Sequence, residues 1–342
     1  MKAVLFRAHG GPDTLSYEDL PVPTIGPEEV LVRVKACALN HLDIWIRQGN
    51  PAYPMPLPHV SGSDVAGIIE QVGTQAEGVT VGQRVFVSPG LSCWKCERCL
   101  AGRDNLCRSY GLVGAMTHGG YAEYVKVPFR NVLPIPENLS FEQAAAFPLV
   151  SVTAAHMLFA LAGLQHGETV LIMGAGSGVG MMAVQMAKLA GARVMTTVGS
   201  DDKIPKAVTL GADAVFNHAK ENVAERVKLL TEGRGVDVVI EHIGPEVWDT
   251  CLHSLGKGGR LITCGATTGG DVKLNLRYVF LHQLTIKESY MGTRAELVKA
   301  SELMGQGRLI SVIDRMFPLQ EARAAQELML SRKFFGKIVL TV

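Results

Sequence analysis

The stretch TVLIMGAGSGVGMMAVQMAKLAGA, residues 169–192, decides the fold. Its first five residues form a short apolar run typical of a buried strand, and its last twelve have the composition of a buried helix. The glycine turn GAGSGVG stands between them. A strand, a tight glycine turn and a helix in this order let backbone N–H groups approach a pyrophosphate at the helix N-terminus. The stretch therefore predicts the start of a dinucleotide-binding unit.

The spacing of the glycines departs from the strict GxGxxG pattern, because Val179 stands where the third glycine belongs if the motif starts at Gly174. An ordinary strand-to-helix turn is the alternative. The sequence that follows favours the nucleotide site, since the short apolar runs ARVMTTV, AVFN, VDVVIE, GRLITCG and LTIKES alternate with helical segments. This order predicts a doubly wound parallel α/β sheet. The turn residues expected to contact the cofactor are Gly174, Gly176, Ser177, Gly178, Val179 and Gly180.

The tip of the second strand, which reads TTVGSDDK, bears on the choice of cofactor. An acidic residue there would bind the ribose 2′-hydroxyl of NAD, but a valine and Gly199 occupy that place. Ser200 can donate to a 2′-phosphate and Lys203 can pair with it, so we expect NADP(H) rather than NAD(H). Asp201 and Asp202 oppose this choice if they contact the ribose; we interpret them instead as a helix N-cap pair.

The first third of the chain has the pattern of short strands. EEVLVRVKACAL, VAGIIEQVG, QRVFVSPG and YAEYVKVP are flanked by Gly or Pro, which predicts a small β-rich domain. Long helical periodicity begins at Phe141. After Met291 come a helix, a strand, a second helix and the final strand GKIVLTV, which needs a partner sheet. We therefore expect one domain over residues 1–149 and 293–342, and a dinucleotide-binding domain over 150–292.

Four cysteines lie close together in CWKCERCLAGRDNLC, with spacers of two, two and seven residues. Thiolates on tight turns can converge tetrahedrally on zinc and fill all four positions, which makes a structural site. An iron–sulfur cluster is the rival, although the usual run ending in Cys-Pro is absent, and unligated reduced cysteines are the third possibility. We predict one structural zinc per chain, in a lobe over about residues 90–110, bound by Cys93, Cys96, Cys99 and Cys107.

The charge and hydropathy of the chain restrict the kinds of partner that it can bind. The chain has 33 Lys+Arg against 32 Asp+Glu and no run of five like charges, which argues against nucleic acid and anionic membranes as partners. No apolar stretch approaches the roughly 18 residues of a membrane span, and the N-terminal apolar run is too short for a signal peptide. We expect a cytoplasmic protein that acts on a small molecule.

Several further motifs carry a family resemblance that spans nearly the whole chain. GSDVAGIIEQVG, the four-cysteine lobe, GGYAEYVKVP, the glycine turn, LGADAVFN, GVDVVIEHIG and GGRLITCGATTG together resemble the medium-chain dehydrogenase/reductase superfamily. The resemblance implies an oxidoreductase with a GroES-like catalytic domain split around a Rossmann domain. It also implies a homodimer or homotetramer joined through the edge strand LTIKES.

The chain departs from the pattern by which alcohol dehydrogenases of this superfamily hold a second, catalytic zinc. Their CHTD-like motif is replaced by NHLD, with Asn40 for the cysteine, and their GHE-like motif by GSD, with Ser63 for the histidine and Asp64 for the glutamate. The third stretch, AAFPLVSVTAAH, contains no cysteine. Because neutral Asn and Ser are poor zinc ligands, we infer no ordinary catalytic zinc. An improvised metal site from His41, His59 and Asp64 is the alternative.

Without a Lewis acid, oxidation of an alcohol loses its usual route to an alkoxide, whereas hydride transfer to a quinone or an activated alkene needs only hydrogen-bond donors at the developing negative charge. The resemblance to the quinone oxidoreductase branch assigns that role to Asn40 and Tyr53 and polar support to Asp64. A turn contact for Asn40 and loop packing for Tyr53 are the alternatives. The resemblance also places His41 at the cofactor phosphates, and a structural histidine beside Asp43 is the alternative. The residues that it places at the nicotinamide are Ile243, Gly265, Ala266, Thr267 and Gly292.

Two other functions stay open at the level of sequence. One is an NAD(P)-dependent alcohol dehydrogenase of the zinc type, and the other is a nucleotide-binding module without turnover. His242, at the end of the strand VDVVIE, is interpreted as a cleft-edge or satisfied core residue and not as a base.

Overall fold

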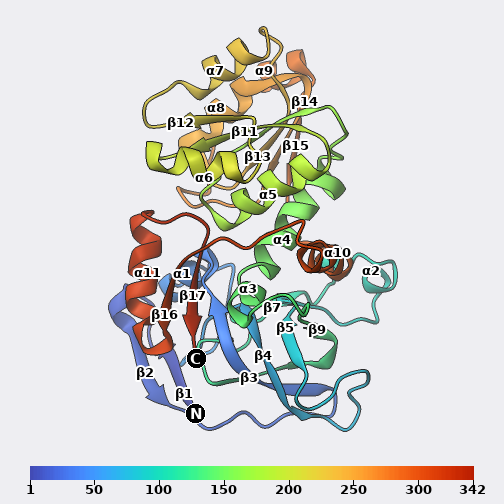
Figure 1. Cartoon of the computed structure of the whole chain (residues 1–342), viewed down its shortest axis with the longest axis vertical. Helices are drawn as coiled ribbons and strands as arrows, with labels where there is room; N and C mark the ends of the chain where they lie inside the picture. The colour runs from blue at the N-terminus through green and yellow to red at the C-terminus, as the bar shows by residue number, and fades with distance from the viewer. The chain divides into compact units, whose positions relative to one another are not determined.

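The computed structural model describes residues 1–342, and the chain divides into two compact units. Unit 1 consists of Met1–Leu149 and Thr293–Val342, and unit 2 consists of Val150–Gly292. Both the first and the last part of the chain therefore belong to unit 1, and Figure 1 follows this course by colour.

Unit 2 is built on a six-stranded sheet in which every pair of neighbours is parallel. Its strands are β10 (Thr169–Ile172), β11 (Arg193–Val198), β12 (Ala214–Asn217), β13 (Val236–Glu241), β14 (Leu255–Thr263) and β15 (Thr285–Glu288). Their order is β12-β11-β10-β13-β14-β15, which is the 3-2-1-4-5-6 order of a doubly wound dinucleotide fold. The predicted α/β fold class is confirmed.

The central strand of unit 2, β10, is apolar and lies inside the sheet between β11 and β13. All four residues of β10 are buried, as a parallel sheet between helices requires. The helices of this unit are α5 (Gly178–Leu189), α6 (Ile204–Thr209), α7 (Val223–Leu230), α8 (Pro245–Ser254) and α9 (Leu276–His282). One core cluster joins Leu171 of β10 and Val239 of β13 to Trp248 of α8.

Unit 1 is the β-rich unit. Its strands are β1 (Lys2–Phe6), β2 (Leu15–Asp19), β3 (Glu29–Ala38), β4 (Asp64–Val72), β5 (Arg84–Val87), β6 (Gly90–Leu91), β7 (Gly111–Leu112), β8 (Tyr124–Pro128), β9 (Val132–Pro134), β16 (Ile313–Pro318) and β17 (Lys337–Thr341). The main sheet runs β16-β17-β3-β4-β5-β9, and β8 also pairs with β3. β17 pairs antiparallel with β3, with Leu340 opposite Cys37, so the end of the chain joins the sheet built by its beginning.

The long helical stretch expected from Phe141 is interrupted in the structure. It consists of α3 (Phe141–Ala145), α4 (Pro148–Ala155) and a π-helical segment, His156–Leu161. Pro148 explains the first break, because proline lacks an N–H and is accepted at the first position of a helix but not inside it. Most of α4 and the whole π-helical segment belong to unit 2, which begins at Val150. Besides α3, the helices of unit 1 are α1 (His41–Gln48), α2 (Glu97–Leu100), α10 (Arg294–Gly305) and α11 (Ala322–Ser331).

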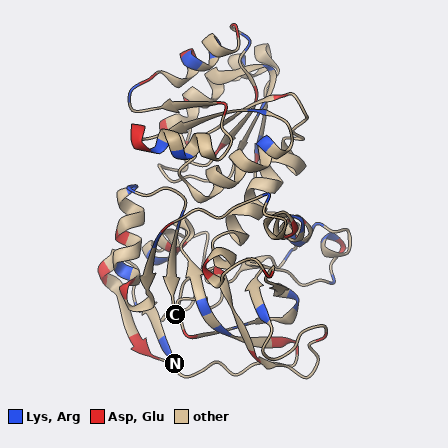
Figure 2. Cartoon of the chain, viewed as in Figure 1, with Lys and Arg blue, Asp and Glu red and all other residues tan.

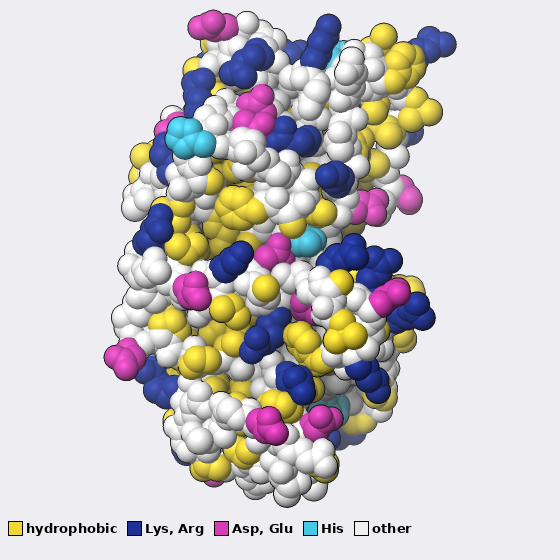
Figure 3. All heavy atoms as spheres, turned by 90° about the vertical axis from the view of Figure 1, so that its right-hand side faces the viewer, with side chains coloured by type: hydrophobic (Ala, Val, Ile, Leu, Met, Phe, Trp, Pro, Cys, Tyr) yellow, Lys and Arg dark blue, Asp and Glu magenta, His cyan; other side chains and the backbone are white.

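Charges of both signs are scattered over each unit. Figure 2 shows Lys and Arg interspersed with Asp and Glu, and the face drawn in Figure 3 carries both signs among hydrophobic side chains. This distribution matches the net charge of +1. None of the helices is both long enough and apolar enough to span a membrane.

Candidate functional site

The glycine turn between β10 and α5 has the backbone geometry of a phosphate-binding loop. Gly174 has a positive φ of 68°, and a Cβ on Gly180 would lie only 2.1 Å from the carbonyl oxygen of Gly174. The Ser177 side chain caps α5 by accepting from the N–H of Gly180 at 2.8 Å. The remaining N–H groups of the first turn have no partner within the helix and are suited to an anion. These residues fit the pyrophosphate of a dinucleotide.

A histidine anchors this turn to the neighbouring strand. The Nε2 atom of His242, which follows β13, lies 3.0 Å from Ser177 Oγ and 2.9 Å from the carbonyl oxygen of Met173. Burial lowers the pKa of His242, so the imidazole is neutral at physiological pH. This geometry makes His242 a hydrogen-bonded structural residue.

Two loops at the carboxyl edge of the sheet lie against one another. Thr267 Oγ1 donates to the carbonyl oxygen of His242 at 3.3 Å, and the N–H of Thr268 donates to that of Ile243 at 2.9 Å. A Cβ on Gly265 would lie 2.6 Å from the His242 carbonyl oxygen, so this approach requires glycine. The structure thus brings Ile243, Gly265 and Thr267 together. Ala266 lies in the same loop, and its carbonyl oxygen accepts from Gly269, while Gly292 is the last residue of unit 2.

A buried glutamate that sequence reasoning missed shapes the first of these loops. Glu241, at the end of β13, is fully buried and accepts from the N–H of Gly244 at 2.6 Å and from Thr263 Oγ1 at 2.7 Å. It also accepts from the N–H of Ile243. The signal was present in VDVVIE, where an acid directly follows the apolar run VVI.

The segment that follows β11 contradicts the interpretation of Asp201 and Asp202 as an N-cap pair. Ser200 occupies the N-cap position of a short 3-10 helix, and the two aspartates lie inside its first turn. Asp201 is held by Lys220 at 2.5 Å and by Asn217 Nδ2 at 2.6 Å, whereas the Ser200 hydroxyl lowers the pKa of Asp202. The prediction that Asp201 and Asp202 form an N-cap pair is therefore wrong, because Ser200 occupies the N-cap position. Gly199 and Lys203 lie on the same segment, which follows β11.

In unit 1 the structure brings Asn40 and Asp64 together with a lysine that the sequence did not single out. Asn40 Nδ2 donates to Asp64 Oδ2 at 2.9 Å, and Lys337 Nζ donates to Asn40 Oδ1 at 2.7 Å and to Asp64 Oδ2 at 3.0 Å. All three residues are buried, and Asn40 retains 6% of its surface. The Asn40 side chain is therefore bonded to two charged side chains, and Asn40 also belongs to the capping box at the start of α1.

A second carboxylate lies beneath this group. Asp43 is fully buried and accepts from the N–H of Asn40 at 2.8 Å, the N–H of Gly62 at 3.1 Å and Tyr121 Oη at 3.1 Å. Burial raises its pKa to about 6, and the hydrogen bonds and Lys337 only partly oppose that shift. Asp43 thereby holds the start of α1, and with it Asn40, against the sheet.

The other residues predicted for this region are His59, His41 and Tyr53. His59 Nε2 lies 3.0 Å from the carbonyl oxygen of Gly114, and burial lowers its pKa to about 4. His41 opens α1 and packs edge-on against Trp45, and Tyr53 lies in the loop after α1. Apart from the four cysteines, the described residues 1–342 contain no group of three or more His, Cys, Asp or Glu side chains placed to hold a metal ion. The alternative site of His41, His59 and Asp64 is therefore not assembled.

Asn40, Ser63 and Asp64 do not fit a catalytic zinc. Lys337 donates to two of these three residues, and its ammonium would repel a dication placed among them. The Ser63 hydroxyl is buried without a hydrogen-bond partner and is a weak zinc ligand.

The four cysteines of the lobe do fit a structural zinc. Their sulfur atoms all lie within 4.8 Å of one another, and individual Sγ–Sγ distances are 3.5 Å for Cys96–Cys99 and 3.9 Å for both Cys93–Cys99 and Cys96–Cys107. Four sulfurs at about 2.3 Å from a tetrahedral zinc lie about 3.8 Å apart. Cys93, Cys96, Cys99 and Cys107 are thus placed as one closed ligand set.

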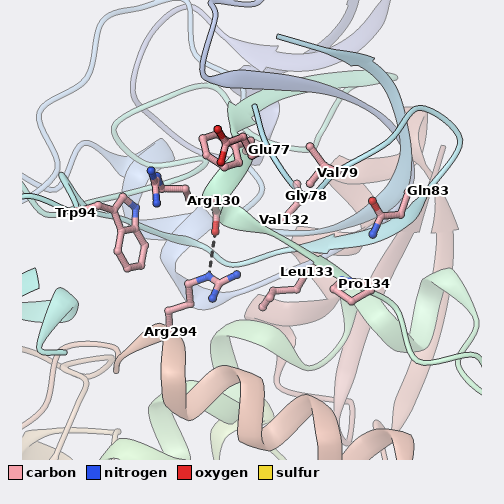
Figure 4. Close-up of a pocket in the computed structure, with 11 residues that line it drawn as sticks. Glu77, Gly78, Val79, Gln83, Trp94, Arg130, Val132, Leu133, Pro134 and Arg294 are labelled. Atoms are coloured by element: carbon pink, nitrogen blue, oxygen red, sulfur yellow. Dashed lines mark hydrogen bonds between the residues drawn. The ribbon is translucent and has the colours of Figure 1, made fainter. Parts of the chain in front are cut away.

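A separate pocket of about 330 Å³ lies next to this lobe and shares no residue with the predicted sites. Figure 4 shows Trp94, Arg130 and Arg294 on one side of it and Leu133 and Pro134 on the other. Arg294 Nε donates to the carbonyl oxygen of Arg130 at 3.0 Å, which ties the start of α10 to the segment before β9.

Comparison with known proteins now identifies the family. Residues 26–137 match the alcohol dehydrogenase GroES-like domain, and residues 178–306 match the zinc-binding dehydrogenase domain. The chain is 32% identical to the quinone oxidoreductase of Homo sapiens over 337 residues, which are 96% of this chain and 93% of that one. It is also 32% identical to the alcohol dehydrogenase of Geobacillus stearothermophilus over the full length of both chains.

A solved structure titled NAD-dependent alcohol dehydrogenase agrees over the full length of both chains, with a TM-score of 0.96 and 44% identity. The fold and the matched domains define an NAD(P)-dependent oxidoreductase. The chain belongs to the medium-chain dehydrogenase/reductase superfamily, which includes both the quinone oxidoreductases and the zinc alcohol dehydrogenases. The predicted resemblance is confirmed.

Proposed function

We propose that the protein transfers hydride from NAD(P)H to a quinone or an activated alkene, with zinc only in the cysteine lobe. The observation that carries this proposal is the buried group of Asn40, Asp64 and Lys337, which stands in place of a catalytic zinc ligand set. An amide in such a group can donate a hydrogen bond but cannot activate an alcohol as a Lewis acid does. Reduction of an electron-poor acceptor needs only hydrogen-bond donors, so it is the reaction that this group can support.

In this proposal Asn40 and Tyr53 donate hydrogen bonds to the oxygen on which negative charge develops. Asp64 supports Asn40 by accepting from its Nδ2 atom, and its other oxygen accepts from the N–H of Leu149 at 2.8 Å. Preorganised donors of this kind typically contribute about 100- to 1,000-fold to kcat.

The cofactor would be held by unit 2. The glycine turn and the start of α5 would bind the pyrophosphate, with His41 as a further contact, and the loops with Ile243, Gly265, Ala266 and Thr267 would line the nicotinamide, with Gly292 near its amide. When bound, NAD(P)H supplies the hydride. We propose NADP(H) as the preferred form, because Gly199 leaves no acid at the ribose and Asp201 is held by Lys220. Ser200 and Lys203 would contact the 2′-phosphate.

A homodimer or homotetramer is the proposed assembly. β15 is an edge strand of its sheet, and α9 nearby exposes Leu276, Phe280 and Leu281 by 69%, 63% and 64%. An unpaired edge beside exposed apolar side chains favours pairing with a second copy. Light scattering should return about twice the chain mass of 36.7 kDa or more, and the monomer mass would contradict this assembly.

The substrate class is tested by a panel of quinones, enones, aldehydes and alcohols with both cofactors. We expect NADPH-dependent reduction of quinones or enones, and a decrease in kcat of about 100-fold in Asn40→Ala. Asn138→Ala, which removes an exposed asparagine of the same unit, serves as the control. The names of two relatives favour a second candidate, alcohol oxidation; turnover of alcohols that is lost with a chelator would establish it. Cofactor binding without any turnover would contradict both.

A further inference from the structure

Lys337 is a buried cation in a strand that is otherwise apolar. It opens β17 in the sequence GKIVLTV, and its side chain is only 3% exposed while that of Asp64 is fully buried. By contrast, Lys126 of β8, which like β17 pairs with β3, forms an ion pair with Glu29 at the surface, where the Lys126 side chain is 45% exposed. Lys337 therefore differs from Lys126 of the same sheet in that almost none of its side chain is exposed to solvent.

Stability is a poor explanation for this placement. Removing two charges from water costs several kcal/mol per ion, and replacing a buried ion pair by apolar side chains is often neutral or stabilising. The ammonium is also spread over two acceptors, of which one is the neutral carboxamide of Asn40. Stability therefore does not explain the contact between Lys337 and Asn40, and this contact needs a functional explanation.

The two charges fix which way the Asn40 carboxamide faces. Lys337 donates to its Oδ1 atom, and Asp64 accepts from its Nδ2 atom. A flipped amide would place its oxygen against the carboxylate and its NH₂ group against the ammonium, which makes two repulsive contacts. Because a carboxamide nitrogen carries two hydrogens, one N–H is bonded to Asp64 and the second is held in a defined direction.

The same ammonium also changes the chemistry of that second N–H. A positive charge on the oxygen side of an amide draws electron density from its nitrogen, and hydrogen bonds in a chain strengthen one another in a buried site. Lys337 contacts Asn40, which replaces the cysteine ligand of the superfamily's catalytic zinc, and Asp64, which replaces the glutamate of the GHE-like motif.

The geometry points to Lys337 as a positioning residue: its ammonium orients and polarises the Asn40 carboxamide, so that Asn40 presents a strong N–H donor to the oxygen of the acceptor substrate. This inference rests on the proposed function of Asn40 and extends it to a residue 297 positions away in the sequence.

Substitution of Lys337 tests the inference through kinetics. Lys337→Met keeps most of the length and removes the charge; we expect kcat for quinone reduction to fall about 100-fold, with the KM for quinone and the Kd for NADPH changed less than about threefold. Lys337→Arg should retain more than about a tenth of kcat. Lys126→Met is the matched control and should leave kcat unchanged. Equal kcat in wild type and Lys337→Met would overturn the inference.

Lys337→Met also leaves Asp64 buried without its cation, so a double variant separates the two effects. Lys337→Met with Asp64→Asn removes both charges together. We expect kcat to stay low in the double variant, because the carboxamide is still not oriented. Recovery of the wild-type kcat would mean that Lys337 serves only to neutralise Asp64, and the inference would be wrong.

A readout without turnover distinguishes this inference from the proposed function. The side-chain amide signals of Asn40 in ¹⁵N-labelled protein can be assigned by their absence in Asn40→Asp. We expect slow hydrogen exchange at these signals in the wild type and fast exchange in Lys337→Met. Unchanged exchange would overturn the orienting role of Lys337. The expected change, together with absent quinone turnover in the wild type, would contradict the proposed function and leave the orienting role supported.

Discussion

The Nε2 atom of His242 lies 3.0 Å from Oγ of Ser177, so the residue after β13 holds the glycine turn that starts α5. The same serine hydroxyl accepts from the N–H of Gly180 at 2.8 Å. One hydroxyl thus both caps the helix and ties it to the adjacent strand. The cofactor turn is shaped by this contact as well as by its glycines.

Ser177→Ala should separate cofactor binding from general stability. Loss of the cap should lower the free energy of unfolding by about 1 kcal/mol. It should also weaken NADPH binding, since the turn loses its tie to His242. Ser140→Ala is the matched control, because Ser140 caps α3 of unit 1 by accepting from Gln143 at 3.2 Å. Thermal unfolding and a fluorescence titration measure the two effects; equal NADPH affinity in both variants would contradict the role of Ser177.

Asp43 should make stability fall as the pH rises from 4 to 7. Its pKa is about 6 in the folded protein and 3.8 ordinarily, so between these values the folded state binds a proton that the unfolded state has lost. The free energy of unfolding therefore decreases with rising pH, by up to about 3 kcal/mol once the carboxyl ionises.

Comparison with Asp43→Asn isolates this titration. His59 acts in the opposite direction, because its pKa of about 4 makes acidification destabilising, but that contribution is common to both proteins. Urea unfolding at pH 5 and pH 7 should show the wild type losing stability relative to Asp43→Asn. Parallel pH profiles would contradict the raised pKa of Asp43 in the folded protein.

Much of the fold was predictable because its signals are local. The apolar runs of unit 2 are short and the helices between them are regular, so five of its six strands were identified within a residue or two of their observed ends. The exception is β14, which begins at Leu255, four residues before the predicted run GRLITCG. The break at Pro148 was also readable in principle, since proline cannot continue a helix. β1 and β2 were missed.

The site was less predictable because it is assembled from distant segments. Asn40 and Asp64 were singled out, but their contact depends on the pairing of β3 with β4, and Lys337 arrives through the pairing of β17 with β3. No local sequence pattern predicts which distant strands pair with one another. The interior charge in GKIVLTV was a usable sign, since lysine is rarely buried without a partner. Neither Asp43 nor Glu241 was recognised as a buried hydrogen-bond acceptor.

The cysteine lobe should lose its metal when one ligand is removed. Cys107→Ser leaves three thiolates, and we expect the bound zinc to fall from one per chain to below about half, with a lower Tm because closed zinc sites contribute to folding. Cys264→Ser, outside the lobe, should keep one zinc. Metal analysis of both purified variants gives the answer, and a full complement of zinc in Cys107→Ser would contradict the proposed ligand set.

The preference for NADPH should depend on Lys203. Lys203→Ala should lower kcat/KM with NADPH by about tenfold, because one charged contact to the 2′-phosphate is lost, and should leave kcat/KM with NADH nearly unchanged. Lys228→Ala removes an exposed lysine of α7 and serves as the control. A wild-type protein that uses NADH more efficiently than NADPH would contradict the preference itself.

The most direct test of the whole account is a count of zinc atoms on a preparation that is turning over substrate. We predict one zinc per 36.7 kDa chain together with reduction of quinones or enones. Two zincs per chain, with the second bound beside Asn40 and Asp64 and required for oxidation of an alcohol, would contradict it.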